Sequence, residues 1–285
     1  MGRVSRRTPV TRWDTAARRS TRRPDAVAVE EPLEIRVDGS PVTVTMRTPG
    51  HDVDLALGFL LGEGLIGGVD DVRTAVHCND VGTDGRPTFN VLEVTLRDGV
   101  PAPDLTGRRN FGMTSACGVC GSASIDAVRA RTGAELLSDR TQVSAEVLVD
   151  LPRRLRQSQP VFERTGGLHA AGLFTAQGSL LAVREDVGRH NAADKLLGAA
   201  ARERGWPLTG TVLVLSGRTS FELVQKAWAA GVPVVAAVSA PSSLAVELAQ
   251  DAGMTLLGFV RPPHLNCYSH PERIVLATRS ASPAG

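Results

Sequence analysis

The sequence has few of the residues that hold small secreted or metal-dependent proteins together. Its 285 residues include only four cysteines, which are too few for a disulfide scaffold. A chain of this length buries enough surface to fold without covalent cross-links. Aromatic residues make up 4% of the sequence, so stacking platforms for single-stranded nucleic acid are scarce. The remaining composition, 42% hydrophobic and 22% charged, is that of a globular protein and excludes a mostly disordered one.

Long hydrophobic runs are also missing. The most apolar stretch, residues 55–69, is interrupted by Glu63 and five glycines and is shorter than the roughly 20 residues of a membrane-spanning helix. Arg6 and Arg7 are followed by Thr8, Pro9 and Arg12 instead of the apolar segment of an export signal. We therefore expect a cytoplasmic protein whose thiols stay reduced.

Positive charge is concentrated at the N-terminus. Residues 1–23 hold eight arginines and one acidic residue, Asp14, which leaves 24 basic and 29 acidic residues and a net charge of −5 for the rest. We predict a disordered arginine-rich arm over residues 1–25, with a tail that binds nucleic acid or membranes as the alternative. Only Lys195 and Lys226 among the 32 basic residues are lysines, a bias that we interpret as genomic.

The next region, residues 26–140, has the pattern of a small α+β domain. Alternating apolar residues predict two strands joined by a turn at Asp38–Gly39, where both positions tolerate a positive φ. A helix, two further strands, a loop and a short helix after the cysteines are expected to follow. The expected ranges are 33–38, 42–48, 52–61, 72–77, 89–96 and 123–131.

From residue 141 to residue 285, apolar strands alternate with helices. Continuous apolar strands are typical of a mainly parallel sheet with both faces covered, so the predicted class of this domain is α/β. Asn191 is a candidate helix N-cap, and Thr219 with Glu222 is a candidate capping box. Helices are expected at 145–156, 192–204, 219–230 and 243–252, and strands at 168–175, 179–184, 211–215, 232–238 and 255–260.

The sharpest motif is the sequence ACGVCG at residues 116–121. Cys117 and Cys120 precede a predicted helix, whose N-terminus favours a thiolate over a thiol. A thiolate in such a loop can attack another sulfur and can hold a persulfide. Three alternatives are a thioredoxin-type redox pair, two buried small residues, and a zinc site. Zinc would need further ligands such as Cys78, Cys267 or a histidine.

Polar residues also follow several of the predicted strands. Small hydroxyl residues, glycine and arginine in such loops let backbone amides and guanidinium groups approach a phosphate. Arg184 and Arg189 could neutralise an anion, and a solvated turn is the alternative. Because no GxGxxG or Walker motif is present, a plain dinucleotide or triphosphate site is not indicated. The segments concerned are 184–191, 216–220 and 239–243, with Gly166, Gly167 and His169 as a weaker fourth group.

Long motifs in this order resemble the formate dehydrogenase accessory sulfurtransferase family (FdhD-type) over residues 32–274. The motifs are MRTPG at 46–50, LALGFLLGEG at 55–64, ACGVCG at 116–121, TGGLHAA at 165–171, VREDVGRHNAADK at 183–195, SGRTSFELVQKA at 216–227, VSAPSSLAVELA at 238–249 and HPERI at 270–274. The arm lies outside this resemblance.

The resemblance implies a sulfur carrier that formate dehydrogenase requires for activity. A cysteine desulfurase would supply sulfur as a persulfide on Cys117, assisted by Cys120. The sulfur would pass to the bis(molybdopterin guanine dinucleotide) molybdenum cofactor before the cofactor enters formate dehydrogenase. The resemblance also implies a homodimer, and no intrinsic metal, nucleic acid or membrane is expected. A non-catalytic cofactor chaperone and a structural zinc protein are the alternative functions.

The cofactor-binding stretch of the family corresponds to residues 259–264 of this chain. The chain departs from the family by having Pro262 and Pro263 after Arg261, which removes backbone amide donors. Together with the strand-end loops, the expected cofactor-binding residues are Phe259, Val260, Arg261, Pro262, Pro263, His264, Arg218, Ser216, Gly217, Ser239, Arg189 and His190.

The family's second domain is similar to the cytidine deaminase fold, a three-layer α/β/α sandwich. The zinc signature of those deaminases, H-x-E followed by P-C-x-x-C, is absent at the corresponding helix starts. This chain has His190–Asn191–Ala192 at the first of them. We therefore expect the scaffold without its zinc-water chemistry.

Overall fold

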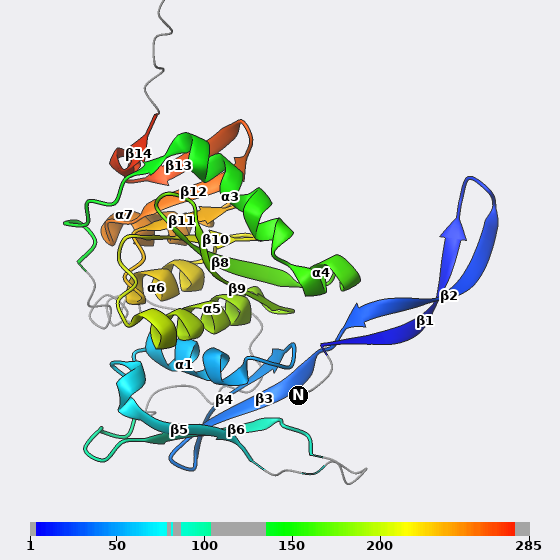
Figure 1. Cartoon of the computed structure of the whole chain (residues 1–285), viewed down its shortest axis with the longest axis horizontal. Coiled ribbons are helices and arrows are strands. Elements are labelled where there is room, and N and C mark those ends of the chain that lie inside the picture. Colours follow the sequence, from blue (N-terminus) through cyan, green and yellow to red (C-terminus); the bar gives the residue numbers. More distant parts are fainter. Residues whose placement is uncertain (1–3, 79–80, 82–86, 104–134, 277–285) are drawn as a thin grey trace, which may run out of the picture.

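The computed structural model describes residues 4–78, 81, 87–103 and 135–276, which form a small sheet, a large layered sheet and a projecting hairpin (Figure 1). The predicted helix at 123–131, Cys117 and Cys120 lie outside the described residues. No helix in the described part of the chain is long and apolar enough to cross a membrane.

The small sheet has four strands in the order β4–β3–β6–β5. Alternate side chains of β3 and β6 are fully buried, and α1 covers that face of the sheet. The turn between the first two strands has a positive φ at Asp38 (47°) and at Gly39 (78°), as the sequence predicts. The elements are β3 (Glu31–Val37), β4 (Ser40–Arg47), α1 (Asp52–Gly62), β5 (Val72–His77) and β6 (Val91–Leu96), with a 3-10 turn at Val69–Asp71.

The large sheet has six strands in the order β13–β12–β11–β10–β8–β9. Only the pairs β10–β11 and β11–β12 are parallel, so the expectation of a mainly parallel sheet is wrong. Short turns join β8 to β9 and β12 to β13, and a short turn can connect only antiparallel neighbours. The strands are β8 (His169–Thr175), β9 (Leu180–Asp186), β10 (Thr211–Leu215), β11 (Val234–Ala237), β12 (Thr255–Arg261) and β13 (His264–Ser269).

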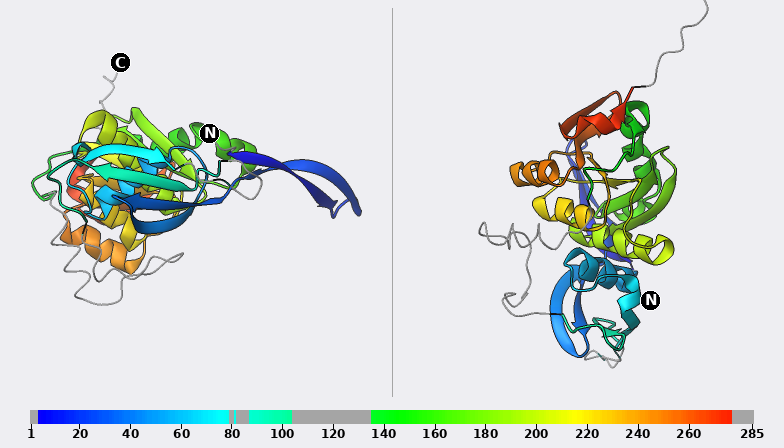
Figure 2. Two further views of the ribbon diagram at one scale, coloured as in Figure 1. Left: turned by 90° about the horizontal axis from the view of Figure 1, so that it is seen from below. Right: turned by 90° about the vertical axis from the view of Figure 1, so that its left-hand side faces the viewer.

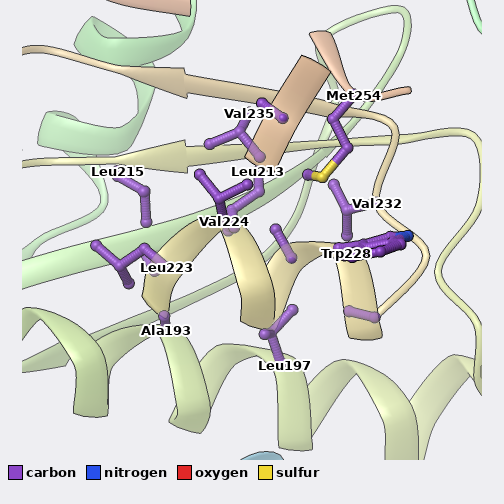
Figure 3. Close-up of a cluster of buried hydrophobic side chains, with 14 of the residues drawn as sticks. Ala193, Leu197, Leu213, Leu215, Leu223, Val224, Trp228, Val232, Val235 and Met254 are labelled. Carbon is purple, nitrogen blue, oxygen red and sulfur yellow. The ribbon is translucent and has the colours of Figure 1, made fainter. Parts of the chain in front are cut away.

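Helices cover both faces of this sheet, which confirms the mixed α/β class. One face packs on α5, α6 and α7 through a core of leucine, valine and alanine side chains, part of which Figure 3 shows. The other face packs on α3. The helices are α3 (Ala145–Gln157), α4 (Pro160–Thr165), α5 (Arg189–Arg204), α6 (Phe221–Ala229) and α7 (Ser243–Asp251). A 3-10 turn at Pro271–Arg273 precedes β14 (Ile274–Val275). This strand forms a short parallel ladder with β7 (Val143–Ser144).

Two predicted helix caps are wrong. The N-cap of α5 is Gly188, and Asn191 lies inside the helix, where its side chain bonds to another part of the chain. The N-cap of α6 is Ser220, so Thr219 forms no capping box with Glu222. In α5, the Asn191 amide donates to the Met46 carbonyl, so a tertiary contact takes the place of the predicted cap.

The small and large sheets meet where α1 crosses α5. A Cβ atom at Gly58 would lie 1.9 Å from the carbonyl oxygen of Asp194, and one at Gly198 would lie 2.0 Å from the carbonyl oxygen of Asp54. Because no side chain fits at either position, the two backbones are in direct contact. Because α1 covers the small sheet and α5 covers the large one, this contact brings the two sheets together (Figure 2).

The N-terminal arm is a β-hairpin and is not disordered, which corrects our expectation for residues 1–25. The strands β1 (Ser5–Asp14) and β2 (Arg19–Ala28) pair along ten residues in unbroken antiparallel register. The hairpin projects from the body, and its inner end lies against α4 (Figures 1 and 2). Charge and polarity favoured disorder, but the continuous ladder satisfies the backbone regardless of the exposed side chains.

Candidate functional site

The predicted loops meet at one edge of the large sheet. The carboxyl ends of β9, β10, β11 and β12 lie there with the starts of β8 and β13. Backbone hydrogen bonds join the loops: the Thr219 amide donates to the Ala240 carbonyl (3.2 Å), and the Phe259 amide donates to the Ser239 carbonyl (3.2 Å). We call this region the carboxyl edge, and it contains all of the predicted cofactor-binding residues.

Three arginines of the carboxyl edge have no partner among the described residues. Arg189, Arg218 and Arg261 form no ion pair with them, and the Nε atom of Arg189 is buried without a hydrogen bond. The Thr219 hydroxyl is also unpartnered, although the residue is 1% exposed. Unpaired guanidinium groups beside an unused hydroxyl suit an incoming anion with several oxygens, such as a phosphate.

Two histidines lie beside these arginines. The His190 Nε2 atom is 3.0 Å from the Ser220 Oγ atom and 3.1 Å from a Glu222 carboxylate oxygen. Burial lowers the pKa of His190 to about 4, and the charges of Arg189 and Lys226 add to the effect. Burial, followed by Arg189, also lowers the pKa of His169. Both rings are therefore neutral at pH 7 and can act as hydrogen-bonding groups without adding charge.

The segment 259–264 forms the tip of the hairpin between β12 and β13. Phe259 has a positive φ of 51° and is exposed, as are Arg261 and His264. The Val260 side chain is instead buried in the core against α3, so only its backbone is available at this edge. Pro262 and Pro263 make the turn between the paired residues Arg261 and His264.

The motif at 184–191 is mainly structural, which the sequence did not reveal. Arg184 bonds to Asp54 of α1 (3.0 Å), so it is not free to neutralise an outside anion as predicted. Burial raises the pKa of Asp54, but hydrogen bonds from His51, Arg202 and Arg184 outweigh it and hold the value at about 2. Asp54 therefore stays ionised as the partner of two arginines.

A buried polar cluster, which we call the clasp, ties this motif to the end of β4. Its members are Asp186, Asn191 and Lys195 with residues 45–48. The Lys195 Nζ atom donates to Asp186 (2.6 Å) and to the Thr48 carbonyl (2.7 Å). Asp186 also accepts from the amides of Thr48 and Gly188. The Asn191 amide is a fourth donor to this carboxylate. Burial raises the pKa of Asp186, and the charge of Lys195 and the hydrogen bonds oppose that rise. The clasp is therefore a buried ion pair in which all four contacts favour the ionised carboxylate.

A second buried ion pair lies at the crossing of the helices. The Lys226 Nζ atom is 2.8 Å from Asp194 and 3.8 Å from Glu63, the C-cap residue of α1. Both lysines of the sequence are thus buried, at 1% and 6% side-chain exposure, between the two sheets. The rarity of lysine in an arginine-rich chain was the one sequence signal that could have identified these positions.

The structure describes two of the four cysteines, Cys78 and Cys267. Cys78 follows β5 in the small sheet, and Cys267 lies in β13 of the large sheet; both are free. Burial raises the pKa of Cys267, which disfavours its thiolate. Among residues that the structure describes, no group of three metal-ligating side chains is arranged to hold an ion. The roles of Cys117 and Cys120 stay predictions from the sequence.

Comparisons with known proteins agree on one family. The model of the FdhD/NarQ family matches residues 28–275. A sulfur carrier protein FdhD of Streptomyces avermitilis is 52% identical over 284 residues, which cover 99% of both chains. Another, of Mycolicibacterium paratuberculosis, is 55% identical over 252 residues, covering 88% of this chain and 93% of that one.

The fold also matches a solved structure. The crystal structure of a formate dehydrogenase accessory protein from Desulfotalea psychrophila aligns with a TM-score of 0.73 at 23% identity. The alignment covers 96% of this chain and 100% of that one. At this identity the likeness shows a shared fold.

Proposed function

This chain belongs to the FdhD/NarQ family, and we propose that it is a sulfur carrier in the maturation of formate dehydrogenase. The relatives that match almost the whole chain are named sulfur carriers. The observation on this chain that supports the proposal best is the group of unpaired arginines at the carboxyl edge, which suits a phosphate-bearing acceptor.

We assign the persulfide to Cys117. Its thiolate would attack the outer sulfur of a persulfide on a cysteine desulfurase. The cysteine of the desulfurase would then leave as a thiolate. Cys120 could then attack the inner sulfur of the Cys117 persulfide, forming a Cys117–Cys120 disulfide and releasing sulfide. The two electrons needed to reduce the sulfane sulfur come from the Cys120 thiolate, so the step needs no other reductant. The chain therefore needs two thiols and a held acceptor, and no general base.

The acceptor in this proposal is the bis(molybdopterin guanine dinucleotide) molybdenum cofactor, bound as a substrate before it enters formate dehydrogenase. Its pyrophosphate groups match the chemistry of Arg189, Arg218 and Arg261, which lie unpaired among the described residues. The exposed tip at 259–264 would supply Phe259 and His264 on the same edge. A cytoplasmic homodimer completes the proposal.

The test follows sulfur on the Cys117 peptide. After incubation with a cysteine desulfurase and cysteine, mass spectrometry should show a reductant-sensitive gain of about 32 Da, one sulfur atom, on that peptide. Cys78→Ala is the matched control and should leave the gain unchanged. Absence of the gain, with Cys117 shown to be a free thiol, would contradict the proposal.

A second experiment, with the variant Cys117→Ala, separates a sulfur carrier from a passive cofactor chaperone. A chaperone needs only the binding edge, so Cys117→Ala would then support full formate dehydrogenase activity in cells. A sulfur carrier with this substitution should leave the dehydrogenase inactive while binding the cofactor as before.

A further inference from the structure

The N-terminal hairpin of β1 and β2 is exposed along most of its length. Every residue from 11 to 25 is exposed, and Trp13 is 73% exposed. The outer part of the hairpin projects from the body, away from the other described elements (Figures 1 and 2). A two-stranded hairpin on its own is only marginally stable in water. Burial against a partner would therefore stabilise this hairpin as well as the complex.

The two edges of the N-terminal hairpin are poorly suited to accept another strand. Pro9 lies directly opposite Pro24 in the register of the ladder. Because proline has no N–H group, both residues lie at positions whose backbone groups point away from the paired strand. The middle of each edge therefore lacks a donor for a third strand. The surface that a partner can bind is thus formed by the side chains on the two faces.

The two faces of the N-terminal hairpin differ in charge. Side chains alternate between the faces of a ladder, so the register shows which residues share a face. One face, which we call the tryptophan face, has two arginines, two prolines and a tryptophan but no acidic residue. Its members are Ser5, Arg7, Pro9, Thr11, Trp13, Ser20, Arg22, Pro24, Ala26 and Ala28. The opposite face carries Asp14 and Asp25 among four arginines.

The arginines of the tryptophan face have no ionic partner in the part of the chain that the structure describes. Arg7 and Arg22 are exposed, and neither forms an ion pair or a side-chain hydrogen bond with a described residue. Their positive charge is therefore available to a second molecule. An acidic surface would be attracted to it over a Debye length of about 8 Å at physiological ionic strength.

The residue types of the tryptophan face favour a protein partner over a nucleic acid. Tryptophan and arginine are enriched at protein–protein interfaces and carry much of the binding energy there. A two-stranded ribbon that enters a nucleic-acid groove would present both of its faces to the phosphates. The opposite face would then bring the carboxylates of Asp14 and Asp25 towards those phosphates. The face is better matched by a protein surface with acidic residues around an apolar centre that receives Trp13.

The inner end of the N-terminal hairpin lies beside the carboxyl edge. A Cβ atom at Gly167 would lie 3.7 Å from the Cβ atom of Ala28, the innermost residue of the tryptophan face on β2. β8 begins two residues after Gly167, at His169. A strand of ten residues spans about 34 Å, so a protein bound to the hairpin would lie next to the carboxyl edge. In the proposed function, formate dehydrogenase is the protein that collects the cofactor from this edge.

We propose that the N-terminal hairpin is the docking site for formate dehydrogenase that has not yet received its cofactor. An acidic surface of that enzyme would bind the tryptophan face, with Trp13 at the centre of the contact. The inference rests on the proposed function, which makes the dehydrogenase the recipient of the cofactor. Nearly all of the hairpin lies outside the segment that the family model matches, which begins at residue 28. Trp13, Arg7 and Arg22 are then specificity residues for the partner protein.

Binding of the full chain to cofactor-free formate dehydrogenase of the same organism, measured by biolayer interferometry, tests the assignment. Trp13→Ala should weaken binding by about ten- to a hundredfold, as expected of a tryptophan at the centre of an interface. Arg7→Glu combined with Arg22→Glu should weaken it at least as much and remove most of its salt dependence. Leu180→Ala should bind as the wild type does. It is the matched control because Leu180 is an exposed apolar residue at the opposite edge of the large sheet.

A photo-cross-linking experiment identifies the occupant directly. With p-benzoylphenylalanine in place of Trp13, irradiation in cells should cross-link the chain to formate dehydrogenase, at a peptide rich in aspartate and glutamate. The same group in place of Leu180 should give no such product. A cross-link to a second copy of this chain or to nucleic acid, with none to the dehydrogenase, would overturn the inference.

Two binding results would also overturn it: no binding of the dehydrogenase by the wild type, or equal binding by the wild type, Trp13→Ala and the double arginine variant. Neither result affects the sulfur gain on Cys117, which would still support the proposed function. Conversely, a chain that binds the dehydrogenase through Trp13 but accepts no sulfur would keep the docking site and remove the sulfur carrier.

Discussion

Arginine side chains are paired with carboxylates in one region of the molecule and unpaired in another. Between the sheets, Arg47 pairs with Asp52, and Arg184 and Arg202 pair with Asp54. At the carboxyl edge, Arg189 and Arg218 pair with nothing that the structure describes. The first set of charges is satisfied within the chain, and the second set is available to the phosphate-bearing acceptor that we propose.

This contrast separates stability from function. A buried charge without a partner loses its hydration and gains nothing in return, so charges between the sheets must be paired. The exposed Arg218 keeps much of its hydration without a partner, so its charge costs little. Arg189 is half-buried and its Nε atom is unpartnered, so its charge costs more and a bound anion would relieve that cost. Residues of the two regions should therefore give opposite phenotypes when changed, one in folding and the other in binding.

The largest effect is expected from the clasp. Lys195→Met removes the partner of Asp186, which is fully buried, and should lower the free energy of unfolding by about 3–5 kcal/mol in urea titrations. Arg218→Met at the edge is the matched control and should change it by about 0.5 kcal/mol or less. Adding Asp186→Asn to Lys195→Met should recover part of the loss. A Lys195→Met protein as stable as the control would show that the clasp does not hold the sheets together.

An intermediate effect, on binding, is expected at the edge. Arg189→Met, Arg218→Met and Arg261→Met should each weaken the binding of GDP, a probe that carries the guanine nucleotide and pyrophosphate of the proposed acceptor. The expected loss is about tenfold, or ~1.4 kcal/mol, and the salt dependence of binding should fall. Arg204→Met, at the other end of α5, is the control and should bind normally. Equal binding by all four variants would mean that the unpaired arginines hold no phosphate.

The parts of the fold that follow from local pattern were predictable. The range of β10 matches its expected range because its continuous apolar residues are all buried. The range of β5 also matches its expected range, although none of its residues is fully buried. The convergence of the strand-end loops was also predictable, since strands separated by helices end at the same edge of a sheet. Arg218 and Arg189 were identified for this reason.

What could not be predicted depends on contacts between distant residues. Arg184 and Arg189 lie in one charged motif, yet the first is neutralised by Asp54, 130 positions away in the sequence. The clasp likewise pairs Lys195 with Thr48, 147 positions away in the sequence. No local pattern distinguishes a charge that folds the chain from one that binds a ligand.

The smallest expected effect is on the pH dependence of stability, where one group from each region acts in the opposite direction. Burial lowers the pKa of His190, at the edge, to about 4, and burial raises that of Asp194, between the sheets, to about 6. Between pH ~4 and ~6.5 the unfolded chain binds a proton at His190 that the folded chain refuses, so acidification through this range costs stability. At Asp194 the folded chain binds the extra proton, so the same acidification adds stability.

Because the two contributions oppose each other, the free energy of unfolding of the wild type should change little with pH in this range. His190→Gln should remove the loss of stability on acidification that His190 causes, and Asp194→Asn should make the loss of stability steeper. Each change should be on the order of 1 kcal/mol across the range, after allowance for solvent screening. Urea titrations at several pH values within that range measure both slopes. If both substitutions changed the slope of unfolding free energy against pH in the same direction, His190 and Asp194 would not act oppositely. The proposed difference between the carboxyl edge and the contact of the two sheets would then be wrong.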